Sequence, residues 1–210
     1  PNRIAIKFYG RSITYRELSA EADRFANALR DLGVQRGDRV MILLPSLPQT
    51  IIAYYGSLRL GAIVVFTSPT NSVAEIIRQV SDAGVKILIG LTRFAAMINR
   101  VQAQTRLDHI ILTHIKDYLP SIKKIAFNAR RSINRSRAKT EIVQGAKLWS
   151  RIIQNQKAIR PDVHIGQNEL AVIIYTGGTS DRPKGVMLSH GNLVANALQT
   201  RHWITDIREG

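Results

Sequence analysis

A short stretch rich in glycine, hydroxyl groups and positive charge follows a hydrophobic segment near the end of the chain. It spans residues 175–186 and has the sequence YTGGTSDRPKGV. Gly177 and Gly178 lack a Cβ atom, so the backbone there can take positive φ angles and approach a bulky anion closely. Phosphate oxygens accept hydrogen bonds from hydroxyl groups and from lysine, which are supplied by Thr176, Thr179, Ser180 and Lys184. The residue types and their spacing therefore predict a phosphate-binding loop.

The stretch does not follow the common Walker pattern, G-x-x-x-x-G-K-[ST]. Lys184 stands between Pro183 and Gly185, so no hydroxyl residue follows the lysine. A surface connection with a solvated lysine would have a similar composition, so composition alone leaves both interpretations open. The order of the residues is more specific.

That order resembles the phosphate-binding loop of the adenylate-forming superfamily, which includes acyl-CoA synthetases, luciferases and peptide-synthetase adenylation domains. The loop of that family runs approximately [YF]-T-[SG]-G-[ST]-T-G-x-P-K-G-V. The positions that fit are Tyr175, Thr176, Gly177, Gly178, Thr179, Pro183, Lys184, Gly185 and Val186, and Ser180 conservatively replaces a threonine. The paired glycines are similar to the form found in long-chain fatty-acid–CoA ligases.

Asp181 departs from the family pattern, which usually has glycine at this position. A carboxylate beside a triphosphate adds like-charge repulsion, unless it turns outward or pairs with a cation. The loss of a glycine also removes backbone freedom. Nucleotide affinity is the property that this departure puts in question.

The resemblance implies a two-step reaction. A carboxylate attacks the α-phosphate of ATP to give an acyl-adenylate and pyrophosphate, and a thiol, commonly that of coenzyme A (CoA), then displaces AMP. The implied cofactors are ATP, Mg2+ and CoA. Positioning of the reactants and neutralisation of the phosphate charge dominate such chemistry, which is why Mg2+ and a lysine are expected beside the triphosphate. The implied catalytic residues are Lys184 and Thr179. The implied nucleotide-binding residues are Tyr175, Thr176, Gly177, Gly178, Thr179, Ser180, Lys184 and Gly185. No residue is assigned as a metal ligand, since the five histidines lack metal-ligand spacing.

A strand must precede this loop and a helix must follow it. Residues 170–175 are a short apolar run typical of a buried strand, and residues 186–188 lead to Ser189, a good N-cap for a helix over 190–199. Upstream, apolar periodicity predicts strands at 4–8, 12–14, 39–44, 62–66, 86–89 and 110–112, and helices at 15–32, 49–60, 73–83, 93–104 and 149–153. Short apolar strands alternating with helices predict an α/β fold with a doubly wound, mostly parallel sheet flanked by helices. Ligands of such sheets bind beyond the carboxyl ends of the strands, where the loop after Tyr175 leaves.

The resemblance extends over nearly the whole chain, with family-like segments at 14–18, 33–40, 60–62 and 81–86. We therefore expect residues 1–210 to be a partial N-terminal AMP-binding domain of an adenylate-forming enzyme, with the C-terminal domain absent. The motifs that the family carries later are the acyl-pocket segment, a tyrosine-glycine-x-threonine-glutamate motif for magnesium, a ribose-binding aspartate and a catalytic lysine. Without them, we expect the 210 residues alone to be inactive and the full-length parent to be active.

Positive charge is concentrated in one part of the chain, which has 210 residues, no cysteine and a formal net charge of +15. Residues 116–160 carry twelve Lys or Arg and two acidic residues, so they hold +10 of this charge. We expect residues 116–160 to form a basic insert within the domain, and residues 116–120 at its start are similar to long-chain acyl-CoA ligases. No apolar run approaches the length of a membrane span. The absence of cysteine is compatible with the cytoplasm.

The basic insert has two interpretations that the sequence leaves open. Apolar residues recur at helical spacing within 120–140, and basic residues lie largely off that face. Such a helix is typical of peripheral contact with an anionic membrane surface, here the inner face. A solvated charged insertion would have the same composition. Nucleic acid is disfavoured, because Phe127 is the one aromatic residue in the densest basic run.

Three classes of function remain open from the sequence. The first is the N-terminal part of an ATP-dependent long-chain acyl-CoA synthetase, with a fatty acid or another carboxylate as substrate. The second is an adenylating enzyme with a different acceptor. The third is a non-catalytic basic module that binds membrane or nucleic acid. Neither the acyl chain length nor the oligomeric state follows from these residues.

Overall fold

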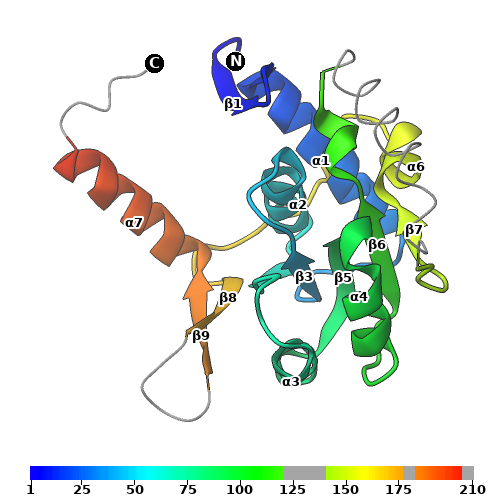
Figure 1. The fold of residues 1–210 in the computed structure, drawn as a ribbon. Helices are drawn as coiled ribbons and strands as arrows, with labels where there is room; N and C mark the ends of the chain where they lie inside the picture. Colours follow the sequence, from blue (N-terminus) through cyan, green and yellow to red (C-terminus); the bar gives the residue numbers. More distant parts are fainter. Residues whose placement is uncertain (121–140, 177–182, 205–210) are drawn as a thin grey trace.

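The computed structural model describes residues 1–120, 141–176 and 183–204 (Figure 1). Its elements, in chain order, are β1 (Ile4–Phe8), β2 (Arg11–Thr14), α1 (Tyr15–Asp31), β3 (Arg39–Leu43), α2 (Pro48–Arg59), β4 (Ile63–Phe66), α3 (Val73–Ala83), β5 (Val85–Leu91), η1 (Thr92–Phe94), α4 (Ala95–Gln102), β6 (His109–Thr113), η2 (Ile115–Tyr118), β7 (Lys147–Leu148), α6 (Trp149–Gln154), β8 (Leu170–Thr176), β9 (Lys184–Ser189) and α7 (His190–Trp203).

Seven of these strands form one sheet in the order β7-β6-β5-β3-β4-β8-β9. Every neighbouring pair is parallel except β8 and β9, which are antiparallel. Strands β1 and β2 form a separate antiparallel hairpin. The predicted α/β fold with a mostly parallel sheet is therefore confirmed.

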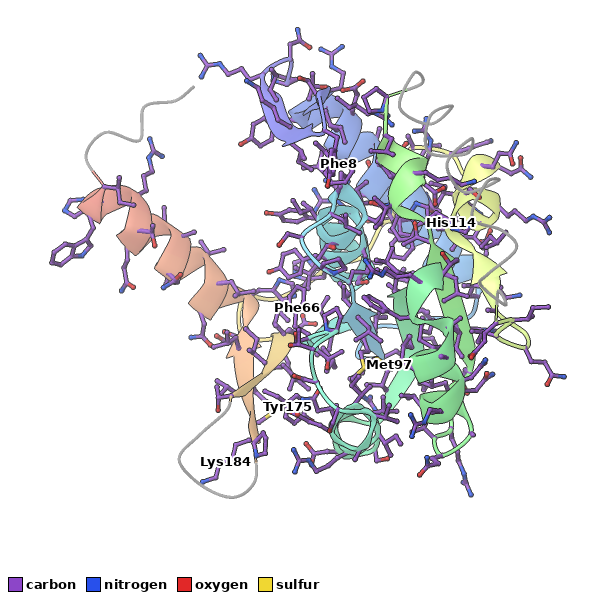
Figure 2. The ribbon with its side chains drawn as sticks, viewed as in Figure 1. Phe8, Phe66, Met97, His114, Tyr175 and Lys184 are labelled. Atoms are coloured by element: carbon purple, nitrogen blue, oxygen red, sulfur yellow. The ribbon has the colours of Figure 1, made fainter. Side chains whose placement is uncertain are left out.

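Helices cover both faces of the sheet, because alternate residues of each strand point to opposite sides. In β3, Val40 and Ile42 pack with α1, α2 and α6, whereas Met41 and Leu43 pack with α3 and α4. Phe66 lies at the edge of the first cluster and Met97 at the edge of the second (Figure 2). Burial on both faces explains why the strands appear as continuous apolar runs in the sequence.

The helix ends follow the capping residues of the sequence. Thr14 caps α1 in a capping box with Glu17, and Ser72 accepts a hydrogen bond from the N–H of Glu75 at the start of α3. Gly84 ends α3 in the left-handed region with φ 61°. A Cβ atom there would also lie 2.7 Å from Nη2 of Arg39, so a larger residue would displace the end of that side chain, and the left-handed backbone is the main reason for glycine.

Two details differ from the sequence prediction. The helix expected over 93–104 is divided into a 3-10 turn, Thr92–Phe94, and a shorter helix, Ala95–Gln102. The two-residue strand β7 was not predicted, because two residues are too short to show a period.

Strand β7 pairs with β6, and Trp149 of α6 stacks on Phe25 at 4.3 Å between ring centroids. Part of the predicted basic insert thus belongs to the main sheet and its core.

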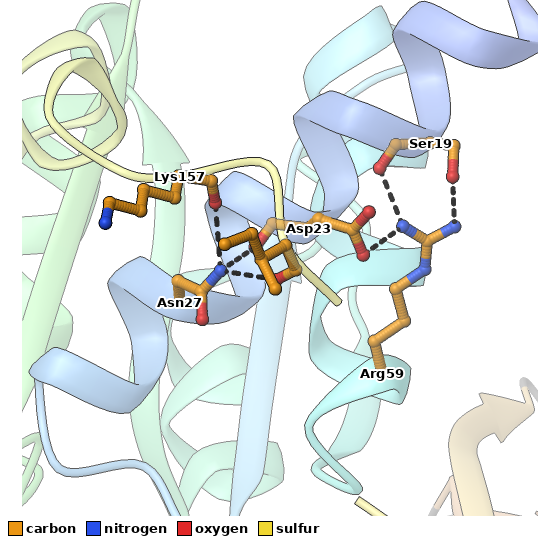
Figure 3. A network of polar contacts seen from close by, with 6 residues as sticks. Ser19, Asp23, Asn27, Arg59 and Lys157 are labelled. Carbon is orange, nitrogen blue, oxygen red and sulfur yellow. Dashed lines mark hydrogen bonds and ion pairs between the residues drawn. The ribbon is translucent and has the colours of Figure 1, made fainter. Parts of the chain in front are cut away.

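A buried polar network joins α1 to α2 and to the segment that leads toward β8 (Figure 3). The side-chain amide of Asn27 donates to the carbonyl oxygens of Lys157 at 3.0 Å and Ile159 at 2.8 Å. Arg59 donates to Oδ1 of Asp23 at 2.6 Å and to the carbonyl of Ser19 at 2.6 Å. These contacts fix a segment without regular structure against the first helix.

The β8–β9 hairpin and α7 extend away from the rest of the molecule (Figure 1). No residue of α7 is buried. Apolar side chains are exposed on this helix and on β9, including Met187, Val194, Leu198 and Trp203. In the part of the chain that the structure describes, no helix combines the length and apolar character needed to cross a membrane.

Replacing Asn27 by alanine is expected to lower the free energy of unfolding by about 1–3 kcal/mol, because the partly buried carbonyls of Lys157 and Ile159 lose the donor that the buried Asn27 supplies. Urea unfolding measures the effect. The control is Gln102→Ala, which removes an exposed amide that donates to the carbonyl of Gln144. Equal losses in the two variants would contradict a structural role for the network.

Candidate functional site

The predicted phosphate-binding loop begins and ends at the carboxyl edge of the parallel sheet. Strand β8 is parallel to β4, so its last residue, Thr176, lies at that edge. Strand β9 returns antiparallel from Lys184, which pairs directly with Thr176. The carboxyl edge is where open α/β sheets bind their ligands, as the sequence predicted for this loop.

Four of the eight predicted nucleotide-binding residues are described by the structure: Tyr175, Thr176, Lys184 and Gly185. The other four, Gly177, Gly178, Thr179 and Ser180, lie outside the described residues, as does Asp181. The described four form two facing pairs across the β8–β9 hairpin, Thr176 with Lys184 and Tyr175 with Gly185. The hairpin thus brings both ends of the predicted loop together.

Lys184 is the cationic residue of this pair of strands. Its side chain is exposed at the end of the hairpin (Figure 2). It forms no ion pair with any residue of the described ranges. The ammonium group can therefore turn toward an anion at the loop without breaking an ion pair to a described residue.

Tyr175 points away from the loop and toward α3. Its hydroxyl donates to Oδ2 of Asp82 at 2.5 Å, and the carbonyl of Gln79 lies 3.5 Å from the same hydroxyl. Burial raises the pKa of Tyr175 above the usual tyrosine value, and the hydrogen bond to Asp82 raises the pKa further. The phenol remains protonated, and its hydrogen is donated to α3.

Gly185 lies directly beneath the Tyr175 ring. A Cβ atom on Gly185 would stand 3.3 Å from Cζ of Tyr175 and 3.0 Å from Cγ2 of Ile173. Both distances are tighter than ordinary packing, so the missing side chain allows the aromatic ring to lie across β9. The structure thus gives Tyr175 and Gly185 a packing contact with each other that the sequence did not predict.

An ion pair stabilises the segment just before β8. Arg36 donates through Nε to Oε2 of Glu169 at 2.7 Å, and Nη2 lies 2.6 Å from Oε1. The N–H of Gly166 donates to the same carboxylate, and this contact, followed by the Arg36 guanidinium, holds the pKa of Glu169 below its usual range. The N–H of His190 donates to the carbonyl of Glu169 at 3.0 Å, which ties the start of α7 to the start of β8.

His190 occupies a helix start, in agreement with its sequence context. Ser189 is the N-cap of α7 in a capping box with Asn192. Partial burial lowers the pKa of His190, and the nearby Glu169 opposes this shift. A lowered pKa keeps the imidazole neutral near pH 7.

A polar cluster that the sequence did not indicate lies at the same carboxyl edge, after β5 and β6. The buried side chain of Gln49 donates to Oγ1 of Thr113 at 3.1 Å and to the carbonyl of His114 at 2.9 Å. Oγ1 of Thr92 lies 2.8 Å from Nδ1 of His114. These hydrogen bonds connect the start of α2 with the segments that follow β5 and β6. In the sequence, the cluster could have been suspected only because its residues lie at the ends of apolar runs or at the start of a helix.

Metal binding depends on the ligands that the chain can offer. Among the described residues, no group of three or more His, Cys, Asp or Glu side chains could hold a metal ion. Magnesium at such sites is bound mainly through substrate phosphates and water, with one or two protein oxygens. The expectation that Mg2+ takes part therefore stays a prediction.

Comparison with known proteins assigns the chain to a family. The family of AMP-binding enzymes matches residues 1–209. The chain belongs to this family. It is 34% identical over 212 aligned residues to a long-chain-fatty-acid–CoA ligase of Bacillus subtilis (strain 168), an alignment that covers 100% of the chain and 38% of that relative. It is 31% identical to a long-chain-fatty-acid–CoA ligase of Haemophilus influenzae, with 98% of the chain and 37% of that relative covered. The chain therefore spans little more than a third of the length of these relatives.

Solved structures support the same assignment. The chain resembles ATP-bound MatB from Rhodopseudomonas palustris with a TM-score of 0.74 and 25% identity, over 97% of the chain and 35% of that structure. It shares its fold with the anthranilate CoA ligase AuaEII, whose complex with anthranoyl-AMP gives a TM-score of 0.77 at 22% identity and covers 94% of the chain and 33% of AuaEII. The fold is thus that of adenylate-forming ligases.

Acid is expected to weaken the contact between Arg36 and Glu169. Because the pKa of Glu169 is lowered from its ordinary value of 4.5, its contribution to stability is complete above that pH and is lost as the pH falls through the folded-state pKa. In Arg36→Met, we expect the thermal midpoint at pH 7 to fall by a few degrees and the loss of stability below pH 4.5 to become shallower.

Thermal unfolding between pH 7 and pH 3 tests this expectation. Arg106→Met is the matched control, because Arg106 is exposed and has no ion pair with a described residue. An unchanged acid dependence in Arg36→Met would contradict the pairing of Arg36 with Glu169.

Proposed function

We propose that the chain supplies the ATP-phosphate-binding part of an AMP-forming acyl-CoA ligase that activates fatty acids. The observation that carries the proposal is the pairing of Thr176 with Lys184 at the carboxyl edge of the sheet, on either side of a glycine- and hydroxyl-rich loop. The similarity to long-chain-fatty-acid–CoA ligases of Bacillus subtilis and Haemophilus influenzae supports long-chain fatty acids as the substrate class. The ATP bound to MatB supports ATP as the nucleotide.

The residues of this chain would act by positioning and charge neutralisation. Lys184 would neutralise the β- and γ-phosphates, and the backbone donors of Gly177 and Gly178 would cradle them. The hydroxyls of Thr176, Thr179 and Ser180 would donate to phosphate oxygens. Magnesium, if bound with the nucleotide, would supply further charge neutralisation beside Lys184. A carboxylate oxygen would then attack the α-phosphorus, pyrophosphate would leave, and the CoA thiol would displace AMP from the acyl carbonyl carbon.

Peripheral membrane contact through residues 120–140 remains a prediction, because 121–140 lie outside the described residues. A cytoplasmic location on the inner face of a membrane would suit an enzyme whose substrate is a fatty acid and whose cosubstrates are ATP and CoA. An adenylating enzyme with another acceptor differs in one assay: it would release pyrophosphate with a fatty acid and ATP but would form no CoA thioester.

Lys184→Ala in the full-length gene product is expected to lower kcat/KM for ATP roughly 10- to 100-fold, because the triphosphate loses its counter-charge as charge builds in the transition state. Lys184→Arg should restore part of the activity. Fatty-acid-dependent pyrophosphate release is the measurement. Lys7→Ala removes an equally exposed lysine from β1 and is the control. Activity of Lys184→Ala equal to that of the control would contradict the proposal.

Asp181→Gly is expected to lower the KM for ATP about fivefold, since removal of a like charge near 4 Å in water is worth about 1 kcal/mol. The substitution also restores the glycine of the family pattern. Asp162→Gly removes an exposed carboxylate elsewhere and is the control. A KM for ATP that rises in Asp181→Gly would show instead that Asp181 assists nucleotide binding.

A further inference from the structure

The hydroxyl of Tyr175 joins the β8–β9 hairpin to α3, where it lies close to Asp82 and to the carbonyl of Gln79. We propose that Asp82 of α3 is a positioning residue for ATP binding: by holding the hydroxyl of Tyr175, it fixes the place where β8 ends and the phosphate-binding loop begins. The inference rests on the proposed function. It assigns to Asp82 a part in nucleotide binding, although Asp82 lies 93 residues from Tyr175 in sequence.

The end of β8 extends past its neighbour in the sheet. The register of β4 and β8 pairs Val64 with Val172 and Phe66 with Ile174, and β4 ends at Phe66. Tyr175 and Thr176 therefore continue beyond the last parallel pair. On their other side they pair with β9, which is itself the edge strand of the sheet. The part of the hairpin nearest the loop thus lacks support from β4.

The Tyr175 side chain provides that support. The ring packs on the cluster that fills the space between the sheet and α3, and the hydroxyl reaches Oδ2 of Asp82 at 2.5 Å. Figure 2 shows Tyr175 between the β8–β9 hairpin and α3. A hydrogen bond to a carboxylate is stronger than one between neutral groups. Here the contact links the free end of the hairpin to a helix that is packed on the sheet through Ile76 and Val80.

The same ring also fixes the returning strand. Because Gly185 has no side chain, the Tyr175 ring lies across the backbone of β9, and Lys184 directly precedes that glycine. A shift of the ring would therefore move both ends of the loop, Thr176 on one side and Lys184 on the other. A positioning error of about 1 Å is sufficient to lower a reaction rate considerably.

The charges around the contact are consistent with this arrangement. Burial and the Asp82 carboxylate both raise the pKa of Tyr175, so the donor proton is retained, while the positive charge of Arg78 acts in the opposite direction. Gln79 contributes its carbonyl oxygen as a second, longer contact. The groups that face the Tyr175 hydroxyl thus come from the C-terminal half of α3.

The test is a set of variants in the full-length gene product: Tyr175→Phe, Asp82→Ala, the corresponding double variant, and Asp82→Asn, whose amide oxygen can still accept the hydrogen bond. We expect Tyr175→Phe and Asp82→Ala each to raise the KM for ATP about five- to tenfold, while the KM for the fatty acid remains unchanged. The double variant should be no worse than either single variant, because both remove one contact. Asp82→Asn should retain an ATP affinity close to that of the wild type.

The controls are Tyr15→Phe and Asp108→Asn, which alter an exposed tyrosine and an exposed aspartate for which no side-chain hydrogen bond or ion pair is found with a described residue. The proposal is overturned if the variants lower the melting temperature but bind ATP like the wild type. It is overturned equally if the effects of Tyr175→Phe and Asp82→Ala add.

Amide hydrogen exchange without nucleotide separates this inference from the proposed function. Loss of the contact should speed exchange in residues 174–176 and 184–186 of Tyr175→Phe and of Asp82→Ala. If the wild type neither binds ATP nor releases pyrophosphate, the proposed function fails, and faster exchange in the variants would still support the hairpin anchor. If the wild type binds ATP and the exchange of the variants is unchanged, the positioning role of Asp82 fails and the proposed function stands.

Discussion

The parallel pairing of β4 with β8 is the interaction on which the site depends. It gives β8 the direction of the other central strands, so the connection after Thr176 leaves at the edge where strands β3, β4, β5 and β6 also end. An antiparallel β8 would place the same loop at the opposite edge. The pairing is stabilised by burial of β8 on both faces, with Val172 in one core cluster and Ile173 in the other. The position of the predicted phosphate-binding loop in the sheet is therefore determined by the direction of this one strand.

Polar contacts hold β8 at its two ends, whereas apolar packing holds its middle. Arg36 and Glu169 fix the beginning, and Tyr175 with Asp82 fixes the end. These contacts differ in character, because the first is an ion pair and the second is a hydrogen bond from a neutral hydroxyl to a carboxylate. Salt in the solvent screens the ion pair. The two ends of the strand are thus held by different kinds of polar contact.

Much of the fold follows from local sequence signals. Thr14, Ser72 and Ser189 are standard N-cap residues, and the helices begin where they predict. Apolar runs predicted the central strands, because burial on both faces leaves few polar side chains in them, and the charged residues Arg39 and Lys86 lie at or near the strand starts. Strand β7 could not be predicted, since its two residues are set by pairing with β6. For the site, the sequence predicts a phosphate-binding loop, which stays a prediction. The contact of Tyr175 with Asp82 depends on how α3 packs against the sheet, and no local pattern encodes that packing.

The outer positions of the loop motif have uses that a ligand alone would not explain. Tyr175 and Gly185 fit the family pattern, yet their side-chain relationship is with each other and with α3. A phosphate requires donors and space, which glycine, threonine and lysine provide, but it does not require an aromatic ring on the strand. The ring is required by the hairpin, because the last two residues of β8 have no partner on β4. The motif therefore combines residues suited to a phosphate with residues that pack the β8–β9 hairpin. Such a combined motif is more specific than a phosphate-binding pattern or a packing pattern alone, because Tyr175 and Gly185 hold the hairpin from which the predicted loop extends.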